Sequence, residues 1–127
     1  MQLLLVMIGG AFGSGARYLL SDFTQRKSPL SVALNFPVGT LTVNLLGCLV
    51  FGVTIGLWRS GLISENWRLF LLAGVCGGFT TFSAFSSDTL ELIYVGREGF
   101  ALINVAVQVI AGLFVLWAGM VVTQRLS

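Results

Sequence analysis

The chain has 127 residues, a formal net charge of +2, 56% hydrophobic residues and only 9% charged residues. Soluble domains carry about 25% charged residues, so this composition excludes an ordinary water-soluble domain and predicts a protein that lies in a lipid bilayer. The small, dispersed charge gives no footprint for nucleic acid. The sequence contains no histidine, which removes the commonest general base and metal ligand.

Four apolar runs predict an all-α membrane protein with four transmembrane helices in one domain, residues 1–127. The predicted spans cover residues 3–23, 36–58, 69–87 and 99–124, and crossing a bilayer takes about 20 apolar residues. The first span requires that Arg17 lies near a helix end or faces protein. It lacks the basic start of a signal peptide, so we expect it to be retained. Pro37 suits the first turn of the second helix.

The basic residues are balanced between the two sides of such a bundle. One side carries Arg59, Arg68 and Arg125, and the other carries Arg26, Lys27 and Arg97, with Arg17 added if it lies at the helix end. The positive-inside rule therefore favours neither orientation. Two alternatives follow from the charges alone: one orientation fixed by other features, or insertion in both orientations with pairing of two inverted copies.

Neutral polar side chains lie inside the predicted spans, where they must face protein or water. The spacing i, i+4 places Thr40 with Asn44 on one face of the second helix, and Asn104 with Gln108 on one face of the fourth. No carboxylate lies deep in any span, which argues against a proton-coupled or cation-coupled carrier. A lining of neutral donors suits a small anion. The alternative is that these groups only join helices, at less than about 1 kcal/mol each.

The segment GVCGGFTTFSAFSSD, residues 74–88, combines aromatic rings, hydroxyls and adjacent glycines. Phe79, Phe82 and Phe85 are spaced so that neighbouring rings share a helix face, and the positive edge of a ring attracts an anion without a charge that would trap it. The glycines and threonines predict that the third helix is broken near its middle. The freed carbonyls need a partner, and carbonyls from two copies suit a small hard cation such as sodium.

Three segments together are similar to the Fluc/CrcB family of fluoride channels: GGFTTFSAFS (77–86), GTLTVNLLGCLVFG (39–52) and GSGARYLL (13–20). The resemblance covers essentially the whole chain. It implies an antiparallel dual-topology homodimer in the bacterial inner membrane, with fluoride as its partner and two fluoride pores. It also implies that the protein exports fluoride passively and so relieves its toxicity.

The resemblance also implies roles for individual residues. It places Asn44, Thr40, Ser83, Phe82 and Phe85 at the fluoride pore, and it places a central structural sodium ion on the backbone carbonyls of Gly77 and Thr80 in both copies. Arg17 would draw anions into a vestibule or anchor the end of its helix. The chain departs from the family at Asp88, where glutamate is usual, and at Asn104 and Gln108, where smaller hydroxyl residues occur in relatives. We expect the last two to donate to the anion as well.

Other functional classes explain less of the sequence. A small multidrug transporter depends on a carboxylate in its first helix, and the run LLLVMIGGAFGSGA has none. A non-transporting assembly protein is supported by glycine pairs such as Gly9 with Gly13, which predict close helix packing within one chain or between copies. It leaves the asparagine and phenylalanine pattern unexplained. An enzyme is least supported, because the sequence offers no nucleophile–base pair or metal cluster.

Overall fold

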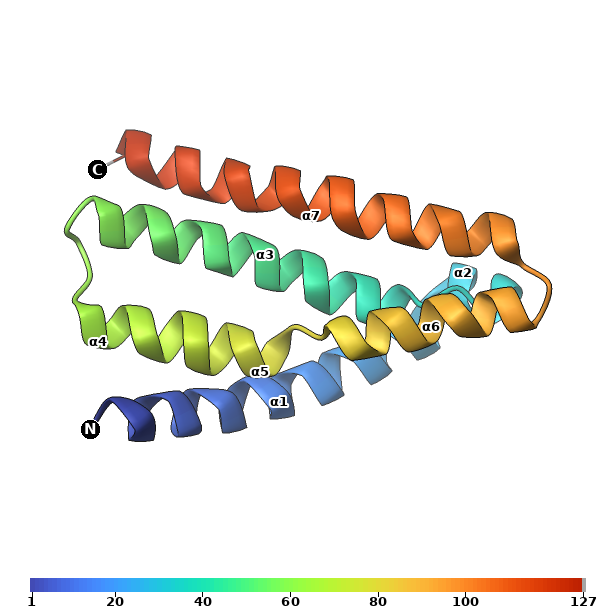
Figure 1. Ribbon diagram of the computed structural model, residues 1–127, viewed down its shortest axis with the longest axis horizontal. Helices are drawn as coiled ribbons and strands as arrows, with labels where there is room; N and C mark the ends of the chain where they lie inside the picture. The colour runs from blue at the N-terminus through green and yellow to red at the C-terminus, as the bar shows by residue number, and fades with distance from the viewer. Residues whose placement is uncertain (127) are drawn as a thin grey trace.

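The computed structural model describes residues 1–126, and every regular element in that range is helical. Figure 1 shows the helices lying side by side as long rods, with both ends of the chain at the same end of the molecule. Four segments are long and apolar enough to cross a membrane: Gln2–Lys27, Val38–Arg59, Glu65–Tyr94 and Glu98–Arg125. The predicted all-α class with four membrane-spanning segments is therefore confirmed at this level.

The helices follow one another with short connections. In chain order they are α1 (Gln2–Lys27), α2 (Pro29–Leu34), α3 (Val38–Arg59), α4 (Glu65–Arg68), the π-helix η1 (Leu69–Cys76), α5 (Gly77–Phe79), α6 (Phe82–Tyr94) and α7 (Glu98–Leu126). The tight turn between α6 and α7 contains Gly96 at φ +74°, a backbone conformation that favours glycine.

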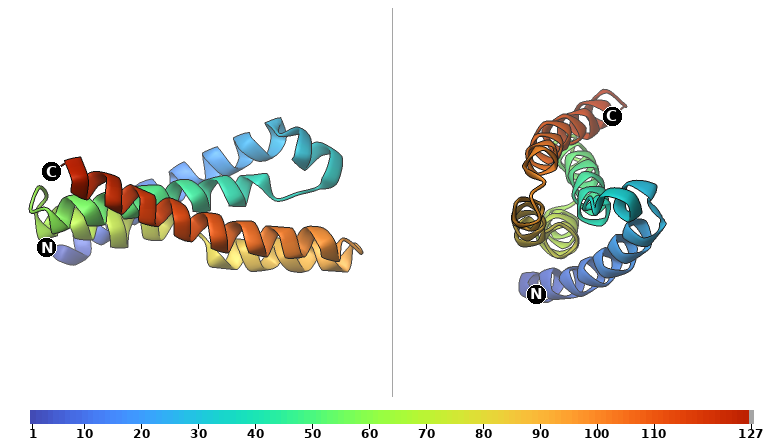
Figure 2. Two further views of the ribbon diagram at one scale, coloured as in Figure 1. Left: turned by 90° about the horizontal axis from the view of Figure 1, so that it is seen from above. Right: turned by 90° about the vertical axis from the view of Figure 1, so that its right-hand side faces the viewer.

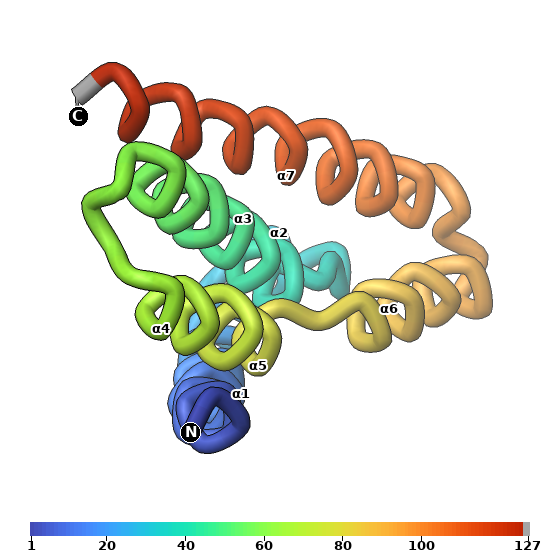
Figure 3. The backbone as a smooth tube through the Cα atoms, turned by 60° about the vertical axis from the view of Figure 1, so that its left-hand side comes forward, coloured from blue at the N-terminus to red at the C-terminus, as the bar shows by residue number. Residues whose placement is uncertain are grey.

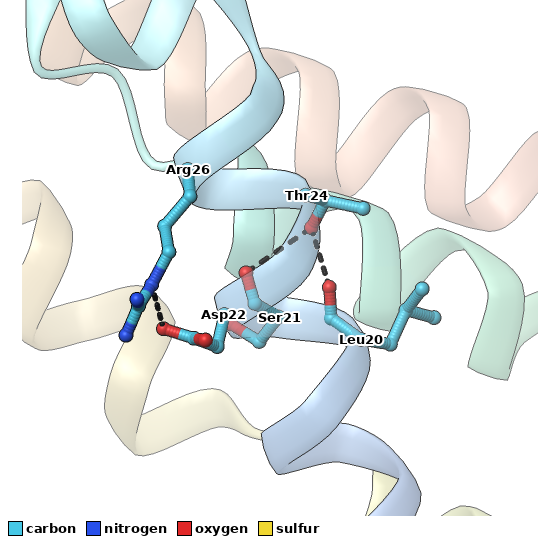
Figure 4. Close-up of polar contacts among 5 residues, drawn as sticks. All are labelled: Leu20, Ser21, Asp22, Thr24 and Arg26. Atoms are coloured by element: carbon cyan, nitrogen blue, oxygen red, sulfur yellow. Dashed lines mark hydrogen bonds and ion pairs between the residues drawn. The ribbon is translucent and has the colours of Figure 1, made fainter.

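Helix α1 continues past the apolar run that predicted it, as far as Lys27, because its last turns satisfy their own polar groups. Figure 4 shows the Thr24 hydroxyl donating to the carbonyls three and four residues before it, at 3.2 and 2.8 Å. In the same view, Arg26 Nε donates to Asp22 Oδ1 at 2.7 Å. These local bonds, together with those of the Gln25 side chain to the backbone of Phe36 and Gly39, let a polar helical turn extend beyond the apolar segment.

Close backbone contacts at glycines hold the helices together. A Cβ atom on Gly9 would lie 2.6 Å from the carbonyl oxygen of Phe70 in η1, and one on Gly119 would lie 3.0 Å from the carbonyl oxygen of Leu49. Helix α3 therefore packs directly along α7, and α1 packs along η1 and α5. Figure 2 shows α3 between α7 and α1. These glycines serve packing within one chain, as small residues do in lipid.

The core of the single chain is small. Val43 is fully buried, and Leu92 and Cys76 are each 2% exposed. Many large apolar side chains point outward along the whole length of the helices, including Leu3, Phe12, Leu19, Leu102, Ile110, Leu113 and Phe114. An exposed apolar surface of this extent is what lipid or another protein chain covers.

Helical geometry stops after Phe79 and resumes at Phe82. Thr80 has φ −86° and ψ 156°, and Thr81 has φ −150° and ψ 115°, so both residues are extended. Figure 3 shows this uncoiled stretch between α5 and α6. Helix α6 then continues to Tyr94, well past the predicted end of the third span at residue 87.

Candidate functional site

Asn44 of α3 holds the extended stretch between α5 and α6 by hydrogen bonds to the backbone of Thr81. The Thr81 N–H donates to Asn44 Oδ1 at 2.9 Å, and Asn44 Nδ2 donates to the Thr81 carbonyl at 3.3 Å. A side-chain amide thus supplies both partners that a continuous helix would have given this residue. In lipid this matters, because water is not available to replace a missing partner.

Two carbonyls next to this stretch have lost the donors that a continuous helix would give them. The Thr81 N–H, four residues after Gly77, donates to Asn44 instead of the Gly77 carbonyl. The Ala84 N–H, four residues after Thr80, donates to Thr81 Oγ1 at 3.2 Å instead of the Thr80 carbonyl. Gly77 is exposed on the chain. Free carbonyl oxygens are the ligands that replace the hydration shell of an alkali cation, so the residues present fit the sodium expected at Gly77 and Thr80.

A cavity of 340 Å³ lies beside Asn44 and contains the predicted aromatic pair. The centroids of the Phe82 and Phe85 rings are 5.6 Å apart, with an interplanar angle of 56°. Phe82 is 79% exposed, so its ring is open to a second molecule as well as to the cavity. None of the described residues that line the cavity carries a charge. The lining residues are Asn44, Gly47, Cys48, Phe51, Thr80, Thr81, Phe82, Phe85, Gln108, Val109 and Leu116.

A chain of side-chain amides leads from this cavity into the protein. Asn44 Nδ2 donates to Gln108 Oε1 at 2.7 Å, and Gln108 Nε2 donates to Asn104 Oδ1 at 3.4 Å. Asn104 Nδ2 then donates to Thr89 Oγ1 at 2.9 Å. Gln108 lines the cavity, whereas Asn104 does not and is completely buried. The network joins α3, α7 and α6.

Besides Gly77 and Asn104, three predicted site residues do not line this cavity: Thr40, Ser83 and Arg17. The Thr40 hydroxyl donates to Asp88 Oδ2 at 2.5 Å, and both residues line a second cavity of 320 Å³ together with Glu91. Ser83 is exposed, and its hydroxyl lies 3.2 Å from that of Thr81. Arg17 lines neither cavity and makes no hydrogen bond or ion pair within residues 1–126. The shorter acid at position 88 thus still reaches the threonine on α3.

Several residues at the site were not singled out from the sequence. Thr81 is the backbone partner of Asn44, Thr89 ends the amide chain, and Cys48 and Phe51 line the cavity. The sequence identifies Thr81 only as one of the hydroxyl residues of the third span and of its predicted break. Cys48 and Phe51 follow Asn44 by about one and two helical turns, so the helical period along α3 is the signal that identifies them. Thr89 follows Phe85 by about one helical turn, so the same period places it near the aromatic pair, but its bond to Asn104 on α7 has no signal in the sequence.

The chain is similar to known proteins over most of its length. The family model described as "CrcB-like protein, Camphor Resistance (CrcB)" matches residues 4–120. Several curated relatives are named "Fluoride-specific ion channel FluC". The one from Methylobacillus flagellatus is 44% identical, and the alignment covers 93% of this chain and 91% of that protein. The protein of that name from Pyrococcus furiosus is 43% identical over 98% of this chain and 97% of its own length. The one from Escherichia coli K12 is 45% identical over 87% of this chain and 84% of its own length. The chain belongs to the CrcB-like family.

Proposed function

We propose that this protein is a fluoride-selective ion channel, not an enzyme, and that it lets fluoride leave the cell passively and so relieves fluoride toxicity. The relatives that carry the name of a fluoride channel align over nearly the whole chain. The observation that carries the proposal is the cavity beside Asn44, which joins two aromatic rings and side-chain amides without a charge among its described lining residues.

The lining of that cavity suits the transfer of a small anion out of water. An unpaired ion in an apolar environment is strongly destabilised, so the lost water must be replaced by other donors. Gln108 supplies amide hydrogens, and Phe82 and Phe85 supply the positive edges of their rings. A neutral lining attracts the anion less strongly than a fixed cation would, which allows it to leave again.

A second, inverted copy of the chain completes the pore in this proposal. Phe82 and Gly77 are exposed in the single chain, at the places where a partner would cover them. The balance of basic residues also persists in the structure, because Asp22 pairs with Arg26 near one end of the bundle and Glu65 pairs with Arg68 near the other. The proposed assembly is an antiparallel dual-topology homodimer in the bacterial inner membrane, with two fluoride pores.

The proposal treats Glu65–Tyr94 as one membrane span that is broken at Thr80 and Thr81. The carbonyls of Gly77 and Thr80 from the two copies would then face each other and hold one structural sodium ion. Bound there, sodium supplies a positive charge that joins the two broken helices. The loss of the helical donors to both carbonyls supports this assignment.

The function is tested by reconstituting the purified protein into liposomes that contain potassium fluoride or potassium chloride. We expect fluoride to leave down its gradient far faster than chloride, as followed by ion-selective electrodes, because the lining is matched to a small anion. Protein-free liposomes provide the control. Equal rates for the two halides would rule out a fluoride-selective channel.

The assembly makes a separate prediction. A reporter on the C-terminus should appear on both sides of the membrane, and replacing sodium by choline should weaken the dimer in detergent, because the carbonyls of Gly77 and Thr80 lose their shared ligand. Reporter accessibility and analytical ultracentrifugation measure the two effects. A reporter on one side only would reject dual topology, and a dimer indifferent to sodium would reject the central ion.

A further inference from the structure

We propose that Asn104 is a positioning residue that never touches the anion. In this assignment Thr89 and Asn104 hold the Gln108 amide so that it turns a hydrogen, and not its carbonyl oxygen, toward the 340 Å³ cavity. The inference rests on the proposed function and adds to it, because it names which amide offers the free donor and what fixes its direction.

The first anchor of the amide chain is the backbone of Thr81. A backbone N–H can only donate, so the Asn44 atom that faces it at 2.9 Å must be the oxygen. Asn44 Nδ2 then has two hydrogens, and both are used: one by the Thr81 carbonyl and one by Gln108 Oε1. Asn44 therefore keeps no amide hydrogen for an anion while this network is intact.

The second anchor is the backbone of Phe85. The Thr89 hydroxyl donates its single hydrogen to the Phe85 carbonyl at 2.7 Å, and a carbonyl can only accept. The hydroxyl oxygen is left as an acceptor, so Asn104 must present its nitrogen to Thr89 and its oxygen to Gln108. Donation thus runs in one direction from the N–H of Thr81 to the carbonyl of Phe85, and reversing any one amide would set two donors or two acceptors against each other.

Gln108 is held at both atoms of its amide by this chain. Its oxygen accepts from Asn44, and one hydrogen of Nε2 goes to Asn104. The second hydrogen of Nε2 has no partner within the part of the chain that the structure describes, and Gln108 lines the cavity with both phenylalanine rings. The bond to Asn104 is the longest of the amide chain, at 3.4 Å, and it is the contact that holds the nitrogen end of the amide. Without Asn104 this flexible side chain is held at one atom only.

The substitution Asn104→Leu tests the inference in the full-length protein. It keeps the branched shape and the number of heavy atoms of the side chain, and it removes the acceptor for Gln108. We expect fluoride efflux from liposomes to fall by about tenfold or more, because hydrogen bonds to ions are about twice as strong as neutral ones and depend on direction. Asn66→Leu, on α4 and outside the amide chain, is the matched control and should leave efflux unchanged.

A second pair of variants separates positioning from general damage. Thr89→Val removes the hydroxyl that orients Asn104, whereas Thr89→Ser keeps it, so we expect the valine variant to lose fluoride efflux and the serine variant to retain it. Thr89 itself does not line the cavity. This pair also decides the question if Asn104→Leu does not fold. Equal efflux in the valine and serine variants, or full efflux in Asn104→Leu, would overturn the inference.

The side-chain ¹⁵N–¹H resonances of Gln108 give a readout that does not depend on transport. In the wild-type protein we expect one of the two amide hydrogens to shift on addition of sodium fluoride, and in Asn104→Leu or Thr89→Val we expect both resonances to move or broaden before fluoride is added. If the wild-type protein passes no fluoride, the proposed function fails, and these resonances still decide whether Asn104 orients Gln108. Unchanged resonances in the variants would overturn that orientation.

Discussion

Replacing both Phe82 and Phe85 by isoleucine should lower fluoride flux about 30-fold while the protein stays folded. Isoleucine keeps the cavity apolar but has no positive ring edge to offer an anion. Each edge contributes on the order of 1 kcal/mol, and a loss of about 1.4 kcal/mol corresponds to a factor of ten in rate. Fluoride efflux from liposomes, corrected for the amount of folded protein, measures the effect.

The matched control for this variant replaces Phe12 and Phe114 by isoleucine. Both rings are exposed, at 67% and 63%, and neither lines the cavity beside Asn44. The control changes the same number of phenylalanines at exposed positions outside the cavity, so its fluoride flux should match that of the unaltered protein. Undiminished flux in the Phe82 and Phe85 variant would mean that the ring edges play no part in conduction.

Replacing Asn44 by leucine should abolish fluoride flux and also destabilise the protein. The substitution leaves the N–H and the carbonyl of Thr81 and the oxygen of Gln108 without their partner. Each buried polar group that loses its partner costs about 1–3 kcal/mol, and these groups are partly buried, so we expect a combined loss on the order of 3 kcal/mol. Liposome efflux and thermal unfolding in detergent measure the two consequences.

The two losses distinguish Asn44 from a residue that only meets the anion. Replacing a residue that only binds the anion would lower the flux and leave the unfolding temperature of the protein unchanged. Because Asn44 also bonds to the backbone of Thr81, its replacement should lower both. Asn66→Leu again provides the control for the change of residue type. If Asn44→Leu unfolded at the wild-type temperature, the hydrogen bonds to Thr81 would not be what holds the stretch between α5 and α6.

The membrane-spanning helices could be predicted from the sequence because each follows from one contiguous apolar run. Their ends could not, because local polar contacts decide them. Thr24 and Arg26 make local polar contacts in the last turn of α1, which lies beyond the predicted end of the first span at residue 23. The predicted third span ended at residue 87, before the carboxylate of Asp88, yet α6 continues because Thr40 donates to that carboxylate. The π-helical geometry of Leu69–Cys76 leaves no mark in the hydrophobic pattern.

The candidate site was predictable only where its residues share a helix. The spacing of Phe82 with Phe85 placed both rings together, and the pair Thr40 and Asn44 was placed on one face of α3. Across helices the spacing says nothing, so Thr40 meets Asp88 while Asn44 meets Gln108, 64 positions away in the chain. The burial of Asn104 likewise follows from its contact with Thr89 on α6, which no pattern within α7 encodes.

The one-way donation from Thr81 to Phe85 has a consequence for how this protein can change over evolutionary time. A hydroxyl can donate one hydrogen and accept another, so serine or threonine of suitable reach can replace Asn104 or Gln108, whereas Asn44 needs both of its amide hydrogens. A carboxylate has no hydrogen to pass on, so a single mutation of Asn104 to aspartate would reverse the bond to Thr89 and cost that hydroxyl its bond to Phe85. We therefore expect acidic replacements at positions 44, 104 and 108 to be purged from lineages, and hydroxyl replacements to be tolerated at positions 104 and 108.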